Sequence, residues 1–455
     1  MKQIPIKPQN SRFTDSQWRS IYDEGKNLLI SASAGSGKTT VLVQRVIEKI
    51  KNGVGIDELL VVTYTNAAAR EMKERIQFAI QKAINVTTDP ALRRHLVQQL
   101  PLLNQANIST LHSFCLKVIR RFYYLIDLDP VFRMLTDETE NLLMKEDVWN
   151  ELREALYGET DTLFQTLAET YSNDRSDDGL TELIFSLYNF SRSNPDPKKW
   201  LDQLPQLYTI ENNDLAATDL FQKLAKPQML QIIDTAIELN ESALVIGQSD
   251  DELSKLTDLL NEEKGHFKSI KDGLEAGNLE SVYTSLHAFS FSRWSAPRKK
   301  TTPEEVKEAA AEMKDFRDQS KSAHDRLIEE YFSVPIDQQI DLMHSVKSLV
   351  EEMSRVTRLF SEAFQQHKAD RRLLDFNDLE HLTYQILTKN ENGEKTSTEA
   401  SDYYRQCFKE VMVDEYQDIN FLQESILKWL TNDDSQAGNQ FMVCLLYTSP
   451  SPRDS

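Results

Sequence analysis

Ten residues near the start of the chain have the composition of a phosphate-binding loop. The run Ser31-Ala-Ser-Ala-Gly-Ser-Gly-Lys-Thr-Thr40 combines two glycines with a lysine and two threonines. Glycines let backbone N–H groups face phosphate oxygens at a helix N-terminus, Lys38 can reach the β and γ phosphates of a nucleotide, and the Thr39 hydroxyl can bind Mg²⁺. The first position of the strict pattern is Ala32 rather than glycine, so a chance glycine- and serine-rich turn remains an alternative. The residues expected to contact a nucleoside triphosphate are Ala32, Ser33, Ala34, Gly35, Ser36, Gly37, Lys38, Thr39 and Thr40.

A second run could supply the metal ligand and the catalytic base. Val411-Met-Val-Asp414-Glu-Tyr-Gln-Asp418 is an apolar segment that ends in two adjacent carboxylates. Ligands of open α/β sheets bind at the carboxyl ends of the strands, so Asp414 would hold Mg²⁺ through water and Glu415 would accept the proton of an attacking water molecule. An Asp-Glu pair alone is most often a solvated turn. Downstream of a phosphate loop, the catalytic interpretation is favoured.

A parallel sheet would bring these two runs together, and the sequence predicts one. The expected strands are residues 27–34, 59–63, 410–414 and 440–443. Helical patterns follow the first two strands, from Thr39 to about Lys51 and from Ala67 to Ala83. The alternation of strand and helix indicates an α/β fold.

A long helical region interrupts the predicted sheet. From about Asp137 to His367 the strand signals fade and helical periodicity dominates. One helix start is marked by Thr302 as N-cap, Pro303 at the first helical position and Glu305 three residues after the cap, which together predict a capping box. Two stretches are predicted to be loops, residues 193–198 and 390–395.

Two motifs resemble a known family. Asp414-Glu-Tyr-Gln-Asp418 looks like motif II of Rep-like superfamily 1 helicases, and Phe13-Thr-Asp-Ser-Gln-Trp18 is similar to their Q-motif. The resemblance implies that Gln17 reads the adenine edge of ATP, that Gln417 helps to sense the γ-phosphate, and that Arg45 contacts nucleotide phosphate. It also implies a RecA-like P-loop sheet, domain 1A, interrupted by an all-α domain 1B, with ATP and Mg²⁺ as cofactors.

Two further motifs resemble the DNA-facing loops of the same family. Thr63-Tyr-Thr-Asn-Ala-Ala-Ala-Arg-Glu-Met72 is similar to motif Ia, and Ser109-Thr-Leu-His-Ser-Phe114 resembles the next such motif. In the family these loops bind single-stranded DNA by aromatic stacking and by backbone contacts. The resemblance implies DNA contacts by Thr63, Tyr64, Asn66, Thr110 and His112. A core tyrosine and a satisfied buried histidine are the structural alternatives.

The segment before motif II narrows the resemblance. Leu374-Asp-Phe-Asn-Asp-Leu-Glu-His381 is typical of the helicase–nuclease and RecB-like branch, and Asp375 can at the same time be a plain helix cap. The domains expected from the resemblance are residues 1–130 and 369–443 for the two segments of domain 1A and 131–368 for domain 1B. Residues 444–455 resemble translated sequencing-adapter read-through rather than a natural tail.

The function implied by the resemblance is ATP-driven 3′ to 5′ translocation on single-stranded DNA. In the full-length protein this would be paired with an exonuclease and would process duplex DNA ends at double-strand breaks for recombinational repair, in a heterodimer with the helicase/nuclease B subunit. The second motor domain and the nuclease domain are missing, so we expect weak motor activity from this chain alone. A Rep-like repair helicase without a nuclease remains an alternative, as does an ATP-binding module that only docks DNA or a partner. A GTP-binding switch would need an Asn-Lys-x-Asp motif, which the sequence lacks.

Composition sets the broad class. A chain of 455 residues with 40% hydrophobic and 27% charged residues is expected to form two or three globular domains. No apolar run approaches the roughly 20 residues of a membrane span, and the polar N-terminus lacks the pattern of a secretory signal, so we expect a cytoplasmic protein without a membrane partner. The three cysteines, Cys115, Cys407 and Cys444, are too far apart in the sequence for a disulfide framework or a cysteine-rich metal site.

Charge is distributed unevenly along the chain. Residues 1–125 carry 18 Lys and Arg against 9 Asp and Glu, a net charge of +9 within a total of −20. The distribution permits a DNA partner without proving one. Within the acidic remainder, a basic island precedes the helix predicted after Thr302, and it consists of Arg293, Trp294, Arg298, Lys299 and Lys300. We expect it to contact the DNA backbone, with Trp294 available for stacking, although a solvated loop is the alternative.

Overall fold

The computed structural model describes residues 4–33, 35–158, 162–172, 176–296, 302–432 and 438–445. The chain divides into two compact units. The sheet unit comprises Met1–Ala155, Glu182–Lys198 and Leu359–Ser455, and the helical unit comprises Leu156–Thr181 and Lys199–Arg358.

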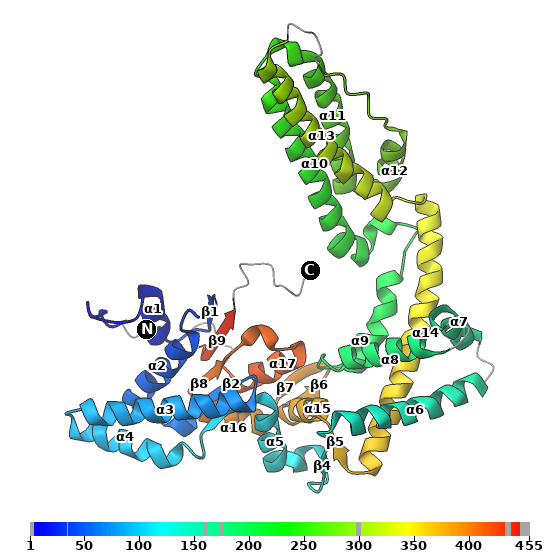
Figure 1. Cartoon of the computed structure of the whole chain (residues 1–455). Helices are drawn as coiled ribbons and strands as arrows, with labels where there is room; N and C mark the ends of the chain where they lie inside the picture. Colours follow the sequence, from blue (N-terminus) through cyan, green and yellow to red (C-terminus); the bar gives the residue numbers. More distant parts are fainter. Residues whose placement is uncertain are drawn as a thin grey trace. The chain divides into compact units, whose positions relative to one another are not determined.

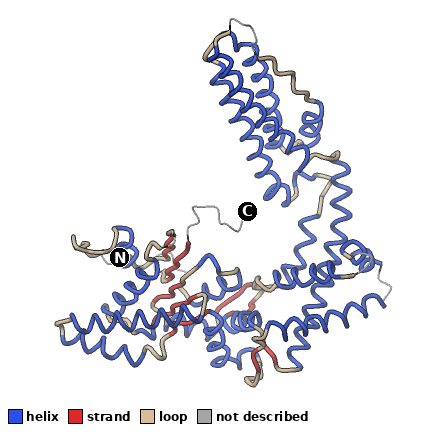
Figure 2. The backbone as a smooth tube through the Cα atoms, viewed as in Figure 1, coloured by secondary structure: helices blue, strands red, loops and turns tan. Residues whose placement is uncertain are grey.

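Five parallel strands form the centre of the sheet unit (Figures 1 and 2). Their order is β1-β9-β8-β2-β3, and they span Leu28–Ala32 (β1), Leu59–Thr63 (β2), Asn107–Thr110 (β3), Glu410–Val413 (β8) and Gln440–Leu445 (β9). The register is fixed by pairs such as Val413 with Met442 and Thr63 with Thr110. The predicted α/β fold with a parallel sheet is therefore confirmed. The strand β9 extends to Leu445, past the expected boundary at residue 443, whereas residues 446–455 of the expected non-native tail lie outside the described part.

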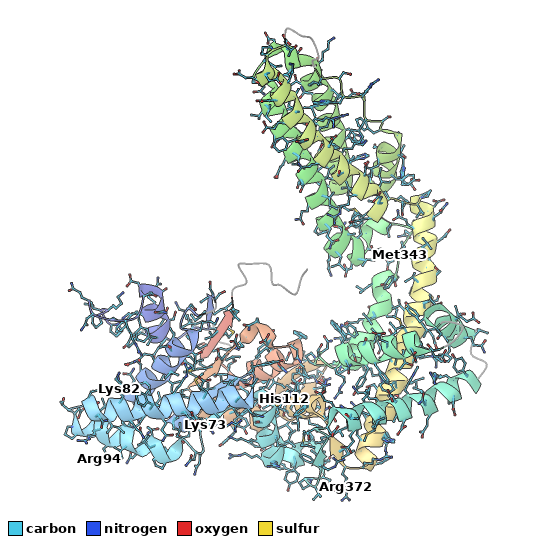
Figure 3. All side chains as sticks on the ribbon, viewed as in Figure 1. Lys73, Lys82, Arg94, His112, Met343 and Arg372 are labelled. Carbon is cyan, nitrogen blue, oxygen red and sulfur yellow. The ribbon has the colours of Figure 1, made fainter. Side chains whose placement is uncertain are left out.

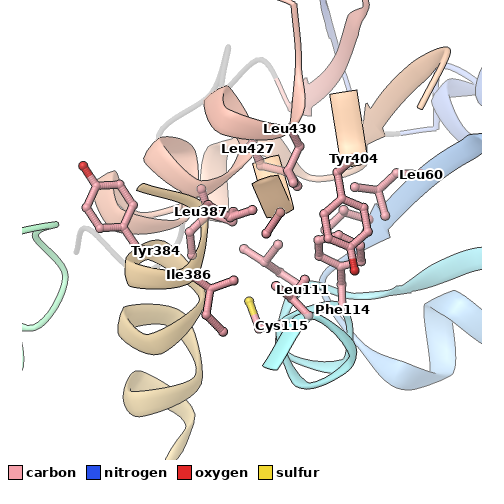
Figure 4. Close-up of a cluster of buried hydrophobic side chains, with 14 of the residues drawn as sticks. Leu60, Leu111, Phe114, Cys115, Tyr384, Ile386, Leu387, Tyr404, Leu427 and Leu430 are labelled. Atoms are coloured by element: carbon pink, nitrogen blue, oxygen red, sulfur yellow. The ribbon is translucent and has the colours of Figure 1, made fainter. Parts of the chain in front are cut away.

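Helices cover both faces of this sheet. They are α1 (Asp15–Tyr22), α2 (Lys38–Lys51), α3 (Asn66–Val86), α4 (Pro90–Leu102), α5 (Leu111–Phe122), α15 (Phe376–Leu387), α16 (Glu399–Cys407) and α17 (Phe421–Leu430). Along β2, Leu60 and Val62 pack with α5 and α15 to α17, whereas Leu59 and Val61 pack with α1 to α4. Figure 4 shows the first of these clusters. Both faces of β2 are buried, which explains why its first four residues are all apolar instead of alternating with polar ones. Each fully buried aliphatic side chain stabilises the folded state by about 1.5–3 kcal/mol relative to leaving it exposed.

The predicted loop at residues 390–395 is wrong. The segment is a β-hairpin of β6 (Thr388–Glu391) and β7 (Glu394–Ser397). Asn392 and Gly393 form its turn with φ of 55° and 90°. Two consecutive residues with positive φ match the twist of the flanking strands, and Asn-Gly is the commonest sequence for such a turn.

The remaining helices belong wholly or partly to the helical unit, and a two-stranded pair, β4 (Arg133–Met134) with β5 (Leu373–Leu374), lies in the sheet unit. The helices are α6 (Glu138–Gly158), α7 (Thr162–Tyr171), α8 (Asp178–Ser191), α9 (Pro197–Gln203), α10 (Lys226–Gly247), α11 (Ser254–Ala276), α12 (Leu279–Ala288), α13 (Glu304–Tyr331) and α14 (Ile336–Asp370). Helices α10, α11 and α13 pack around buried side chains that include Phe267 and Met313. The predicted helical insertion is thus present. Its packing boundaries differ from the expected 131 and 368, because α6, α8, α9 and α14 each run from one unit into the other.

The predicted capping box at Thr302 is wrong by one residue. Pro303 is the N-cap of α13, which begins at Glu304. The Thr302 hydroxyl instead donates a hydrogen bond of 3.0 Å to Oε2 of Glu252. A proline at N-cap provides no side-chain acceptor, so Glu304 and Glu305 in the first turn stabilise the helix start through its dipole.

Candidate functional site

The sequence motifs gather at one edge of the sheet. Because all five strands are parallel, their carboxyl ends lie on the same side. The phosphate loop follows β1, Asp414 follows β8, Tyr64 follows β2, and Thr110 is the last residue of β3. Such an edge is where ligands of open α/β sheets bind.

The loop after β1 has the backbone geometry of an anion site. Gly35 and Gly37 have φ of 74° and 82°, values that residues other than glycine rarely adopt. Gly37 is the N-cap of α2 and provides no side-chain cap, so backbone N–H groups of the first turn have no partner within the helix. The buried Ser36 Oγ also has no hydrogen-bond partner among the described residues. Ala34 lies outside the described part, and the exposed Ser33 precedes it.

The lysine of the loop folds back over its own backbone. Lys38 Nζ donates to the carbonyl oxygen of Ala32 at 3.2 Å and to that of Ser33 at 3.5 Å. Thr39 and Thr40 follow it in the first turn of α2 and are half-buried. Among the described residues its hydrogen bonds go to these two carbonyls, and the ammonium can transfer from them to phosphate oxygens, which are stronger acceptors.

Asp414 lies close enough to Lys38 for their charges to interact. Burial raises the pKa of Asp414 above its usual value, and repulsion from Glu415 raises it further, whereas Lys38 lowers it. The backbone of Asp414 is fixed by a 2.9 Å hydrogen bond from its N–H to the carbonyl of Val62 in β2. The raised pKa means that too little positive charge surrounds Asp414 to balance its carboxylate. A divalent cation that also binds phosphate oxygens would supply this charge.

Gln417 fixes the side chain of Glu415. The amide nitrogen of Gln417 donates to Oε2 of Glu415 at 2.7 Å, and its amide oxygen accepts from the backbone N–H of Leu445 at 2.9 Å. Glu415 has a φ of 55°, a left-handed conformation that redirects the chain immediately after β8. The carboxylate expected to act as base is therefore held between its own turn and the end of β9. Sensing of the γ-phosphate by Gln417 stays a prediction.

Gln17 docks the first helix onto the phosphate loop. Its amide nitrogen donates to the carbonyl of Ser36 at 2.8 Å, and its amide oxygen accepts from the backbone N–H of Thr14 at 2.9 Å in the capping box of α1. The two proposed nucleotide-binding segments are thus in direct contact. Recognition of adenine by Gln17 stays a prediction, and it would require at least one of these hydrogen bonds to be exchanged.

The position of Arg45 departs from the expectation that it contacts nucleotide phosphate. Its guanidinium is 1% exposed and forms a bidentate ion pair with Glu410, at 2.5 and 3.0 Å. It also donates to the carbonyls of Ser20 and Ile21 and lies 4.5 Å from the ring centroid of Phe441. These hydrogen bonds use four of the five guanidinium N–H groups, and they join Arg45 of α2 to α1 and β8 while its guanidinium lies over Phe441 of β9. The sequence could not show this, because its partner is 365 residues away.

The expected DNA-facing residues form a second cluster at the same edge. Tyr64 is 68% exposed, whereas Thr63 is buried and donates to the carbonyl of Thr65. The exposed Asn66 starts α3, and its Oδ1 accepts from the buried Thr110 hydroxyl at 3.5 Å, so the two motifs touch.

His112 has partners that the sequence did not indicate. Its Nε2 lies 2.8 Å from Oε1 of Glu380, and its ring centroid lies 5.0 Å from that of Phe376. The side chain is 35% exposed, so it is neither a buried core histidine nor free. Figure 3 labels His112, and it labels Lys82 and Arg94 away from it, near the end of α3 and the start of α4.

Both interpretations of residues 374–381 are compatible with the structure. Asp375 is the N-cap of α15 and forms a capping box with Asp378. In addition, Lys368 Nζ contacts Asp375 at 2.6 Å and Asp378 at 2.5 Å, and Arg192 contacts Asp378 at 3.0 Å. All four side chains are buried, so the segment anchors the ends of α8 and α14 to the sheet unit.

The basic island is only partly described. Arg293 is exposed, and Arg298, Lys299 and Lys300 lie outside the described residues. Trp294 is half-buried in the cluster around Met313, with Arg317 at 5.4 Å from its ring centroid, and its buried Nε1 has no partner among the described residues. The expectation that Trp294 is available for base stacking is therefore not supported, because the ring already packs in the helical unit.

No helix in the described part of the chain is both long and apolar enough to span a membrane.

These features define the class of the protein. A parallel sheet whose first strand leads through a glycine loop into a helix, with an acidic pair ending a nearby strand, is the architecture of a P-loop nucleotide-binding domain. The family model of the UvrD/REP helicase N-terminal domain matches residues 13–444. The chain belongs to the UvrD/REP helicase family.

Similar proteins carry the name of the A subunit of an ATP-dependent helicase/nuclease. One from Enterococcus faecalis is 51% identical over 442 residues, which cover 97% of this chain and 35% of that protein. Others from Lactiplantibacillus plantarum and Bacillus cereus are 44% and 38% identical over 96% and 97% of this chain, and in both the match covers 35% of the relative. This chain therefore spans about a third of the length of these relatives.

Proposed function

We propose that this chain is the ATP-binding front part of a DNA helicase motor. In the whole protein the motor would translocate 3′ to 5′ on single-stranded DNA and unwind duplex ends, paired with an exonuclease and with the B subunit of the heterodimer, in processing double-strand breaks for recombinational repair. The observation that carries the proposal is the shared carboxyl edge of the parallel sheet, where the glycine loop follows β1, Asp414 follows β8 and the exposed Tyr64 follows β2.

The chain's own residues account for the binding steps. Bound ATP and Mg²⁺ would supply the electrophilic phosphorus and its charge neutralisation. Lys38 would exchange the carbonyls of Ala32 and Ser33 for phosphate oxygens, which raises the strength of its hydrogen bonds. Thr39 and Asp414 would hold the cation.

Hydrolysis would depend on Glu415. This residue would accept the proton of the attacking water, and the hydrogen bond from Gln417 would keep its carboxylate oriented for that role. Because Gln417 also accepts a hydrogen bond from Leu445 in β9, a shift at the end of β9 would change the position of the Glu415 carboxylate.

DNA would bind along the neighbouring strand ends. The exposed Tyr64 could stack on a base, and Asn66 and His112 could contact the backbone, a mode that tolerates any sequence. The basic charge of residues 1–125 favours a polyanion at this edge.

Two alternatives within reach of the same sequence differ from this proposal. A repair helicase without a nuclease would share the motor but lack the exonuclease. An ATP-binding module that only docks DNA or a partner would bind nucleotide without DNA-dependent turnover.

The proposal is tested by ATP turnover in the full-length protein together with its partner subunit, with and without single-stranded DNA. We expect a rise in kcat on adding single-stranded DNA, ATP-dependent unwinding of a duplex with a 3′ tail, and degradation of the product strand. Turnover that is indifferent to DNA favours the binding module, and unwinding without degradation favours the nuclease-free helicase.

A further inference from the structure

One buried carboxylate joins the DNA-facing edge to the segment after the catalytic acids. Glu380 lies on α15, and its side chain is 2% exposed. A single oxygen, Oε1, lies 2.8 Å from Nε2 of His112 and accepts a 2.6 Å hydrogen bond from Nε2 of Gln423. The other oxygen is buried and has no hydrogen-bond partner among the described residues. Both contacts are therefore made to the same atom, which can accept two hydrogen bonds at once.

Gln423 is part of the start of α17, the helix that follows the turn carrying the catalytic acids. Its backbone N–H donates to Oδ1 of Asn420 at 2.8 Å, and its own Oε1 accepts from the Asn420 N–H at 3.3 Å, which closes a capping box. Tyr416, in that turn, packs against the hydrophobic cluster that includes Leu422 and Ile426 of the same helix. The start of α17 is thus fixed to the turn that carries Glu415 and Gln417.

A buried carboxylate whose acceptor sites are only partly used is sensitive to its remaining partners. Removing a charge-assisted hydrogen bond inside a low-dielectric site costs more than at the surface, and the remaining bond then strengthens and shortens. His112 is half-exposed at the edge, so a ligand can displace it, whereas the half-buried Gln423 is also held by the capping box of α17.

We propose that Glu380 is a positioning residue that transmits DNA contact at His112 to the base Glu415 through Gln423. When His112 turns toward DNA, Oε1 of Glu380 is left to Gln423 alone, and the start of α17 moves with it. Turnover thereby responds to DNA. This inference rests on the proposed function, because it assumes that DNA stimulates ATP hydrolysis.

The test measures ATP turnover against single-stranded DNA concentration in the full-length protein with its partner subunit. Glu380→Met keeps the length of the side chain but removes the acceptor, and Glu380→Gln keeps the acceptor without its charge. We expect Glu380→Met to lower the DNA-stimulated kcat by about tenfold or more while the half-saturating DNA concentration changes by less than about threefold, with Glu380→Gln in between. Gln423→Leu breaks the other end of the connection and should give the same loss as Glu380→Met.

The matched control is Thr383→Val on the same helix. The Thr383 hydroxyl donates to the carbonyl of Cys115 at 3.3 Å, so it joins α15 to α5 without touching His112 or Gln423. Thr383→Val should change the stimulation by less than about twofold. A loss in Thr383→Val equal to that in Glu380→Met would show that general packing of α15 is responsible and would overturn the inference.

The outcomes separate this inference from the proposed function. Absence of DNA stimulation in the parental protein would overturn both. Stimulation in the parental protein that persists in Glu380→Met or in Gln423→Leu would overturn the inference alone.

Discussion

The buried ion pair of Arg45 and Glu410 gives a stability prediction that also tests the role of Arg45. Arg45→Met removes two charge-assisted hydrogen bonds to Glu410 and two bonds to carbonyls of α1. It leaves Glu410, 4% exposed at its side chain, with only Lys49 at 3.4 Å as a cationic neighbour among the described residues. Removing one partner of a buried pair costs about 3–5 kcal/mol, and since Lys49 remains we expect the lower end, about 3 kcal/mol.

The assay is urea unfolding followed by circular dichroism. The double variant Arg45→Met with Glu410→Met should recover about 1–2 kcal/mol of the loss, because no unpaired charge is then buried. If the double variant is as unstable as the sum of both single variants, the pair is not the source of the effect. The same double variant should bind ATP within about threefold of the parental chain, and a loss of tenfold or more would instead reinstate Arg45 as a nucleotide contact.

Two further predictions concern the catalytic acids and the helical unit. Glu415→Gln in the full-length protein should keep ATP and Mg²⁺ binding but lower hydrolysis by at least about 10², whereas Asp414→Ala should lose the dependence on Mg²⁺, and turnover at the parental rate in Glu415→Gln would place the base elsewhere. In the helical unit, burial lowers the pKa of His266 to about 4, and burial also lowers the pKa of its neighbour His324. Because these groups bind fewer protons when folded, their contribution to stability is fully present above the unfolded pKa near 6.5 and is lost as the pH falls toward 4. After allowance for partial exposure, the unfolding free energy should fall by about 1–2 kcal/mol between pH 7 and pH 5, a decrease that His266→Gln should reduce and that calorimetric scans would detect.

The sequence predicts the sheet well because its signals are local. The run Leu59–Thr63 is apolar up to Val62 and is buried on both faces, and its limits coincide with those of β2. The start of α2 is set within one residue by the glycines and Lys38 of the loop. Helix and turn starts that depend on one side chain are harder to predict from the sequence. The Thr302 hydroxyl donates a hydrogen bond to Glu252, which is 50 residues away in the sequence, and the N-cap of α13 is Pro303.

The parts of the candidate site that lie in a sequence motif can be predicted. The parts whose role depends on contacts with residues far away in the sequence cannot. The phosphate loop and Asp414 could be found because their residue types and spacing follow from phosphate chemistry. The role of Glu380 could not be found in this way. A carboxylate on an amphipathic helix is expected to face solvent, and only the contacts with His112 and Gln423 show that it does not. Trp294 reads as a stacking residue for a similar reason, although Arg317 and the core around it already cover its ring.

The central claim is that the glycine loop and Asp414 form an ATP site, and the most direct test is calorimetric titration of this chain with ATP and Mg²⁺. Lys38→Ala removes a charge-assisted contact worth about 1.5–3 kcal/mol, so the affinity should fall roughly ten- to a hundredfold. Lys51→Ala, at the far end of the same helix and paired with Glu48, makes the same change in net charge and should leave the affinity within about twofold of the parental value. Equal affinities for the parental chain and Lys38→Ala would contradict the assignment of the site.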